Sequence, residues 1–346
     1  MTRELPRTLE QALDPAWLTE ALAPVSGGAR VTEVEKVEVL RTMATKVRFK
    51  ARYEDGATGS YCLKAFLDME AADGNRANTA SVRESDFYNV IAPKVSVRVP
   101  ECVTAPVDRE AQFGVVIMQD LIVRGGHFCT ALEPFDAARA KKSLEQLARL
   151  HTSHSIFGAE ALSWAPRQIT WLAEANIIPP DVLQGMMNDA RSEGLPARAR
   201  DAELLLKGLK ALAAVDADRP PSLIHGDCHA GNIFETSEGT GLIDWQLLQQ
   251  GGWALDVAYH IAAILTVEMA EREERALVSH YLETVRSLGG TTPDAEKAWL
   301  QYRMAPVYGF FLWSITRKVD RPIINAFCNR LGSSVIRHDS FGLLGL

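Results

Sequence analysis

The stretch Leu223-Ile-His-Gly-Asp-Cys-His-Ala-Gly-Asn-Ile-Phe234 decides how this chain of 346 residues is interpreted. An apolar pair leads into a polar loop, and a second apolar segment, Gly241-Leu-Ile-Asp-Trp245, follows a few residues later. This pattern predicts a strand, a loop and a strand, with Asp227, Asn232 and Asp244 converging at the open end. Asn232 and Asp244 supply the hard oxygen ligands that suit Mg²⁺, which leaves Asp227 to orient a hydroxyl and take its proton.

The same stretch resembles the catalytic loop of the aminoglycoside phosphotransferase and choline kinase-like (ecdysteroid kinase-like) superfamily. Asn232 follows Asp227 by five residues, as in the kinase pattern, and Asp244 stands where the metal-binding Asp follows. The resemblance implies a protein-kinase-like fold, ATP as cofactor (GTP not excluded), Mg²⁺, and a small-molecule hydroxyl acceptor as partner. It assigns catalysis to Asp227, Asn232 and Lys64, and Mg²⁺ binding to Asn232 and Asp244.

Two positions in the first third of the chain extend the resemblance. Lys64 lies in the stretch Ser60-Tyr-Cys-Leu-Lys-Ala-Phe66, a strand with apolar neighbours, where the kinase lysine that binds phosphate belongs. Arg83-Glu-Ser-Asp-Phe-Tyr88 looks like helix C of the family. Glu84 is therefore expected to pair with Lys64, and both residues are expected to contribute to nucleotide binding.

Two further segments are assigned by the same resemblance. Met118-Gln-Asp-Leu121 is similar to the hinge between the lobes, which places Gln119 and Leu121 beside the adenine. The loop that should cover the nucleotide, near residues 40–45, contains no glycine. Because members of the aminoglycoside type often use Ser or Thr there, Thr42 and Thr45 are the expected phosphate contacts.

Strands are predicted in the first third of the chain and helices after it. Alternating apolar and polar residues predict a hairpin over 46–66, with further strands over 95–103 and 113–118. One helix is expected over 78–91, with Asn78 or Thr79 as its N-cap. Helices are expected after an Asp136 N-cap and over 202–215, 254–267, 275–288 and 293–318. The predicted fold class is α+β, with a strand-rich nucleotide-binding lobe (1–120), a mostly helical catalytic and substrate lobe (121–346) and a hinge near 119–127.

Composition excludes several classes of protein. The 37 basic and 44 acidic side chains give a formal charge of −7, which argues against a nucleic-acid partner. No apolar run approaches the ~20 residues that span a bilayer, so no membrane partner is expected. The five cysteines are an odd number and widely scattered, which favours a reducing, cytoplasmic location over a disulfide framework.

The acceptor is predicted from what the chain lacks and from its aromatic residues. Only about a dozen residues separate Asp244 from Asp256, too few for the activation segment with which a protein kinase docks a peptide. The aromatic stretch 302–313 lies where the family's helical subdomain approaches its acceptor, and the acids after residue 257 are not concentrated. We therefore expect a small, neutral and partly apolar acceptor. An aminoglycoside or choline-type kinase is the alternative, and a pseudokinase-like nucleotide-binding regulator is the alternative from another class.

Several residues also have plain structural interpretations. His225 is expected to pack the loop and bond to backbone, as its counterparts in the family do. His225, Cys228 and His229 could instead bind zinc in a metal-dependent hydrolase, although no distant Cys/His pair supports such a site. Asp256 is predicted to be the N-cap of the next helix, with support of the catalytic loop as the alternative. The aromatic residues of the stretch 302–313 are predicted to be helix core more readily than pocket wall; they are Tyr302, Tyr308, Phe310, Phe311 and Trp313.

Overall fold

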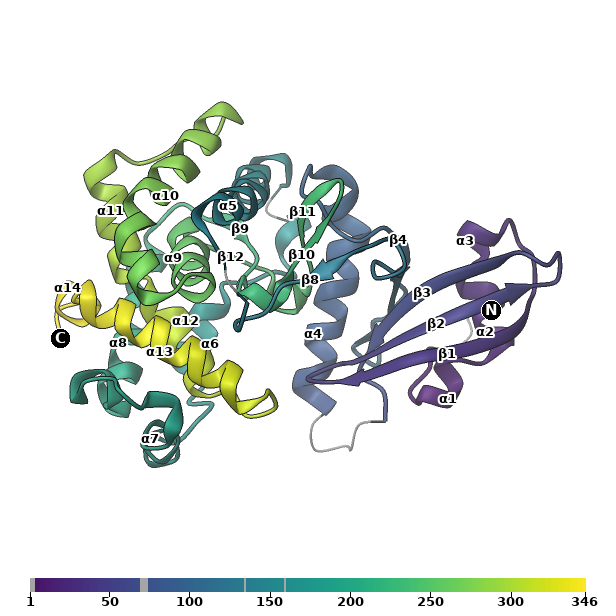
Figure 1. Cartoon of the computed structure of the whole chain (residues 1–346), viewed down its shortest axis with the longest axis horizontal. Coiled ribbons are helices and arrows are strands. Elements are labelled where there is room, and N and C mark those ends of the chain that lie inside the picture. The colour runs from purple at the N-terminus through teal and green to yellow at the C-terminus, as the bar shows by residue number, and fades with distance from the viewer. Residues whose placement is uncertain (1–3, 69–73, 134, 159) are drawn as a thin grey trace. The chain divides into compact units, whose positions relative to one another are not determined.

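Residues 4–68, 74–133, 135–158 and 160–346 are described by the computed structural model of the protein, and their packing divides the chain into two units (Figure 1). The first unit comprises Met1–Lys94, Val99–His127 and Asp244–Leu247. The second comprises Val95–Arg98, Phe128–Ile243 and Leu248–Leu346. Residues 95–98 thus belong to the second unit although the first unit surrounds them in the sequence, and residues 244–247 belong to the first unit although the second surrounds them.

An antiparallel sheet of five strands forms the first unit, in the order β1-β2-β3-β7-β4. Its strands are β1 (Val31–Arg41), β2 (Thr45–Tyr53), β3 (Thr58–Ala65), β7 (Val116–Gln119) and β4 (Cys102–Thr104). A small hairpin of β5 (Val107–Asp108) and β6 (Phe113–Gly114) accompanies it. The predicted hairpin over 46–66 is confirmed as β2 and β3, whose apolar residues alternate with polar ones as β-strand geometry requires.

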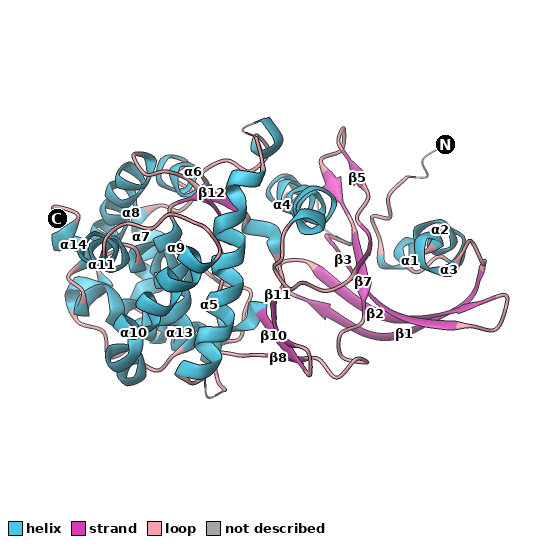
Figure 2. Cartoon of the chain, turned by 90° about the horizontal axis from the view of Figure 1, so that it is seen from above, coloured by secondary structure: helices cyan, strands magenta, loops and turns pink. Residues whose placement is uncertain are grey.

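The two faces of this sheet are covered by different helices. Val47 and Phe49 pack in one core with Trp17 and Leu18 of α2 (Pro15–Ala21). The short helices α1 (Leu9–Ala12) and α3 (Ala23–Ser26) flank α2 in the sequence. Side chains alternate between faces along a strand, so Lys64 projects from the opposite face, where α4 (Gly74–Asp86) lies (Figure 2). The lysine expected to bind phosphate therefore stands on the face that α4 covers.

Two predictions for the first unit need correction. The helix expected over 78–91 begins at Gly74, so Asn78 and Thr79 lie inside it, and its last turn, Phe87–Ile91, is a π-helix. Asn and Thr favour caps, but that preference does not prevent a helix from starting a turn earlier. Of the strand expected over 95–103, only Cys102 and Val103 lie in β4.

Helices dominate the second unit, and α9 (Trp253–Ile264) is buried along nearly its whole length, from Ala254 to Ile264. The other helices are α5 (Ala137–Thr152), α6 (Gln168–Glu174), α7 (Pro180–Met187), α8 (Ala202–Ala217), α10 (Val267–Ser287), α11 (Ala295–Met304), α12 (Pro306–Ser314), α13 (Arg321–Arg337) and α14 (Ser340–Leu343). As predicted, Asp136 caps α5, accepting a hydrogen bond from the Arg139 backbone.

Short strands frame the candidate catalytic loop. β9 (Ser222–Ile224) pairs with β12 (Gln249–Gly251), and β10 (Ile233–Thr236) pairs with β11 (Gly239–Leu242), beside β8 (His127–Phe128). The predicted order of strand, loop and strand is therefore present, with the loop 225–232 running from β9 to β10.

The helix predicted over 293–318 is two helices, α11 and α12. Pro306 starts the second of them, because a proline lacks the N–H that a helix interior needs but is tolerated in a first turn. The helix predicted over 275–288 is the second part of α10, and α13 was not anticipated. Among the described residues, no helix is both long and apolar enough to cross a membrane.

Candidate active site

Asp227 lies in the loop between β9 and β10, and its side chain is held by Tyr259 of α9 and by Asn232 at the end of the loop. The Tyr259 hydroxyl donates to Asp227 Oδ1 at 2.9 Å, and Asn232 Nδ2 lies 3.3 Å from Oδ2. The same Nδ2 donates to the Asp227 backbone oxygen at 2.7 Å. Asp227 nevertheless keeps 28% of its side chain exposed, so its carboxylate is oriented and also accessible to a ligand.

Trp313 in turn holds the tyrosine that orients Asp227. Trp313 Nε1 donates to the Tyr259 hydroxyl at 2.6 Å. Burial, together with the nearby Asp227 carboxylate, raises the pKa of Tyr259 well above its usual value. Tyr259 therefore stays protonated and can act only as a donor to Asp227.

Asp256 supports the loop from inside α9, and the N-cap prediction for it is wrong. The helix begins at Trp253 with Gly252 as N-cap, one turn before the sequence suggested. The Asp256 carboxylate instead accepts hydrogen bonds from the backbone N–H groups of His225 and Gly226, at 2.7 and 2.8 Å. Burial acts to raise the pKa of Asp256, but hydrogen bonding to His151 and the loop backbone outweighs it and lowers that pKa.

The structural interpretation of His225 agrees with its contacts. Its Nε2 lies 2.9 Å from the Ile243 backbone oxygen, and its Nδ1 accepts from the Asp227 N–H at 3.2 Å. Cys228 is buried, with its thiol donating to the Asp256 backbone oxygen, and burial raises the pKa of that thiol well above its usual value. In the described part of the chain, the three potential zinc ligands of this loop do not form a cluster.

In the first unit, Lys64 lies between two carboxylates. Its Nζ is 2.8 Å from Glu84 Oε2 and 2.8 Å from Asp244 Oδ1. Burial alone would lower the pKa of Lys64, but Asp244 and Glu84 more than offset this and raise it. Burial also raises the pKa of Glu84, an effect that Lys64 opposes. The structure therefore brings together three of the residues that the sequence assigned to nucleotide and metal: Lys64, Glu84 and Asp244.

Lys46 is a member of this cluster that the sequence analysis missed. It lies opposite Lys64 in the β2–β3 register, and its Nζ is 3.6 Å from Asp244 Oδ2. Hairpin pairing alone could have found it, because directly opposite residues share a face. Asp244 itself has a φ of 68°, a left-handed backbone conformation that is uncommon outside glycine.

The remaining nucleotide positions are ordered parts of the first unit. Thr42 closes the turn between β1 and β2, where its N–H donates to the Ala44 oxygen at 3.1 Å. Thr45 is buried at the start of β2. Gln119 ends β7, and the Leu121 oxygen accepts from two backbone N–H groups of the following turn. Their contacts with a nucleotide stay predictions.

The aromatic residues of the stretch 302–313 lie in the helical core, as the sequence predicted. All five rings are buried: Tyr302, Tyr308, Phe310, Phe311 and Trp313. Tyr308 donates to the Gly226 backbone oxygen at 2.8 Å, so its hydroxyl supports the catalytic loop. Because these rings are covered by protein, they do not supply the apolar pocket wall on which the neutral-acceptor prediction relied.

The donor atoms suit a hard divalent cation. Asn232 commits its amide nitrogen to Asp227, which leaves its Oδ1 oxygen for a cation. The Asp244 carboxylate already attracts the ammonium groups of two lysines. An amide oxygen and a carboxylate are each ligands that Mg²⁺ accepts, and the binding of one ion by both residues stays a prediction.

The chain is similar to known proteins in sequence and in structure. The model of the phosphotransferase enzyme family, APH, matches residues 50–294. A thiamine kinase of Salmonella paratyphi B is 34% identical over 108 residues, which are 31% of this chain and 35% of that protein. The chain thus matches about a third of the length of its curated relatives.

Two solved structures show the same fold. An aminoglycoside 2'-phosphotransferase-IIIa in its GDP complex has a TM-score of 0.52 and 14% identity, over 94% of this chain and 99% of that one. A choline kinase from Cryptosporidium parvum Iowa II has a TM-score of 0.54 and 11% identity, over 96% and 95%. The predicted α+β, protein-kinase-like fold is confirmed. Because the family model spans well over half of its residues, the chain belongs to the phosphotransferase enzyme family.

Proposed function

We propose that this protein transfers the γ-phosphate of ATP to a hydroxyl of a small-molecule acceptor. The observation that carries the proposal is the accessible Asp227 carboxylate, held by Tyr259 and Asn232. A carboxylate in such a position can orient an alcohol and receive its proton. GTP is a possible second donor.

In the proposed reaction, the acceptor oxygen forms a bond to the γ-phosphorus and the bond to the β–γ bridging oxygen breaks. The hydroxyl proton goes to Asp227, and ADP leaves. Lys64, positioned by Glu84, binds phosphate oxygens of the nucleotide. Asn232 and Asp244 would hold Mg²⁺, which neutralises charge on the phosphates when bound. Phosphoryl transfer needs mainly such positioning and neutralisation.

The test is acceptor-dependent formation of ADP over a broad alcohol library that includes choline, thiamine and an aminoglycoside. Asp227→Asn should lower kcat by at least about 100-fold, the scale of general-base catalysis. Asp218→Asn, an exposed residue after α8, is the matched control and should leave kcat unchanged. An Asp227→Asn enzyme with normal turnover would refute the assignment. Nucleotide binding without turnover of any acceptor would favour the pseudokinase alternative.

A further inference from the structure

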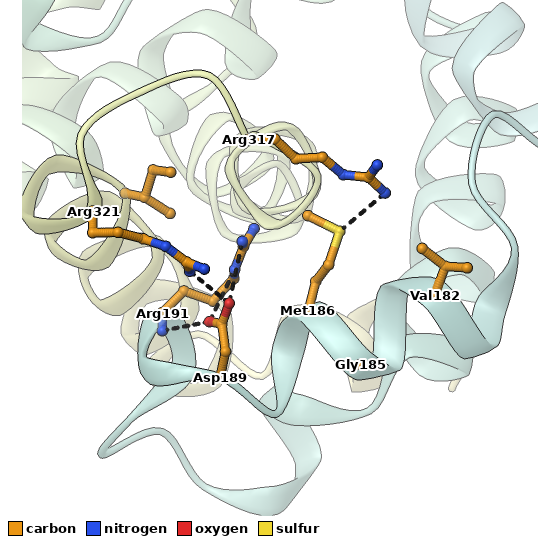
Figure 3. Close-up of a pocket in the computed structure, with 8 residues that line it drawn as sticks. Val182, Gly185, Met186, Asp189, Arg191, Arg317 and Arg321 are labelled. Carbon is orange, nitrogen blue, oxygen red and sulfur yellow. Dashed lines mark hydrogen bonds and ion pairs between the residues drawn. The ribbon is translucent and has the colours of Figure 1, made fainter.

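A cavity of about 430 Å³ lies in the second unit, between α7 and the start of α13 (Figure 3). Its polar lining consists of three arginines and one acid: Arg191, Arg317, Arg321 and Asp189. Val182, Met186 and Ile324 supply an apolar part of the wall. The cavity therefore combines positive charge with an apolar surface.

The single acid does not neutralise this cavity. Asp189 pairs with Arg321 at 2.6 Å and with Arg191 at 3.1 Å. Arg191 is buried and also donates to the backbone oxygens of Ser314 and Thr316. Three guanidinium groups against one carboxylate leave two positive charges among the lining residues.

Arg317 carries the charge that is most available to a ligand. Its side chain is exposed, and among the described residues its only polar partner is the Met186 sulfur, at 3.5 Å. A thioether is a weak acceptor, so a ligand with a carboxylate or phosphate would be a far better partner. Guanidinium groups bind such oxyanions through two parallel hydrogen bonds.

One element of the cavity wall, α13, also carries a ring that packs close to Asp227. Trp313, at the end of α12, and Phe327, one turn after Ile324 on α13, pack their rings 4.2 Å apart. Both rings contact His229, with centroids 5.1 and 5.2 Å away. His229 Nε2 in turn lies 3.7 Å from Asp227 Oδ2. Trp313, Phe327 and His229 therefore form one packed cluster that reaches Asp227, and Phe327 shares α13 with Ile324 of the cavity wall.

We propose that this cavity binds the acceptor, and that the acceptor carries an anionic group, a carboxylate or a phosphate, on a partly apolar body. The inference rests on the proposed function and replaces the neutral acceptor expected from the sequence. It also disfavours cationic acceptors, because two uncompensated positive charges would repel them.

The test measures equilibrium binding to the full chain by calorimetry, without nucleotide, so that it does not depend on turnover. The probes share one body and differ in charge: 4-(hydroxymethyl)benzoate, benzyl alcohol and [4-(hydroxymethyl)benzyl]trimethylammonium. A phosphonate analogue of the first probe separates recognition of a carboxylate from recognition of a phosphate-like group. We expect the anions to bind at least about tenfold more tightly than the other two probes, as charge-assisted hydrogen bonds imply.

Arg317→Gln should lower the affinity for the anionic probes about tenfold and leave the affinity for benzyl alcohol unchanged. Arg317→Glu should shift the preference towards the cation. Arg272→Gln removes one positive charge from an exposed site on α10 and serves as the matched control, with no expected change. Equal binding of all probes, no binding, or an Arg317→Gln variant that keeps its anion affinity overturns the inference.

Failure of the inference and failure of the proposed function give different results. Anion binding that depends on Arg317, without phosphorylation of any acceptor, contradicts the kinase proposal and supports the cavity assignment. Phosphorylation of neutral or cationic acceptors alone supports the kinase activity and contradicts the anionic acceptor.

Discussion

Tyr259→Phe tests whether the hydrogen bond to Asp227 serves catalysis. The substitution removes one oxygen atom and keeps the ring that fills the core around α9. Two hydrogen bonds disappear with it: the one to Asp227 at 2.9 Å and the one from Trp313 at 2.6 Å. The first bond orients the proposed base, and the second only holds the tyrosine.

The size of each effect follows from these two bonds. A hydrogen bond to a charged group contributes about 1.5–3 kcal/mol, which corresponds to a fall in kcat of roughly tenfold to 100-fold if all of it orients the base. The Trp313 N–H is left without a partner in a buried site, at a cost of about 1–3 kcal/mol of unfolding free energy. For a unit of this size, each kcal/mol lowers Tm by about 2–4 °C.

Tyr302→Phe provides a matched control. Tyr302 is also fully buried in the second unit and donates to a carboxylate, Glu274, at 3.2 Å. Both variants should lose Tm, but only Tyr259→Phe should lose kcat. The KM for ATP should stay unchanged in both variants, because neither tyrosine is assigned to the nucleotide.

The assay is steady-state formation of ADP, with thermal unfolding followed by circular dichroism on the same samples. An unchanged kcat in Tyr259→Phe would refute the positioning role. An equal loss of kcat in Tyr302→Phe would also refute it, since it would show that any destabilised core lowers turnover.

Three further predictions concern the supports of the site. Glu84→Gln weakens the positioning of Lys64 and should raise the KM for ATP about tenfold in steady-state kinetics; an unchanged KM would contradict the assignment. Asp256→Asn leaves a buried loop N–H facing an amide donor, and should lower the unfolding free energy in urea by about 2–3 kcal/mol, whereas a loss below about 0.5 kcal/mol would argue against the support role. Burial lowers the pKa of His260 from 6.5 to about 4, so the unfolded state binds a proton that the folded state resists. Stability should therefore be complete above pH 6.5 and fall by about 3 kcal/mol towards pH 4, a slope that urea titrations of His260→Gln should show to be reduced.

Local pattern was enough to predict several elements. The β2–β3 hairpin was predicted correctly because strand side chains alternate with a period of two. The polar face of β2 forms ion pairs with the neighbouring strand β1. Arg48 and Arg52, for example, pair with Glu38 and Glu33. The start of α9 was predicted wrongly. Asp256 has the residue type of an N-cap and precedes an apolar run, but the helix had already begun at Trp253.

The amino-acid sequence was sufficient to identify the kinase-like family, the loop that carries Asp227 and Asn232, and the pairing of Lys64 with Glu84. These features depend on short spacings or on residue order, which the chain displays directly. The long-range packing alone showed that Tyr259 and Trp313 orient Asp227, that Asp244 meets the lysine pair of the hairpin, and that three arginines share one cavity with Asp189. Apart from Asp189 and Arg191, the partners in these contacts stand tens of residues apart, and a hydrogen bond or ion pair across such a separation forms only when packing brings the two groups together.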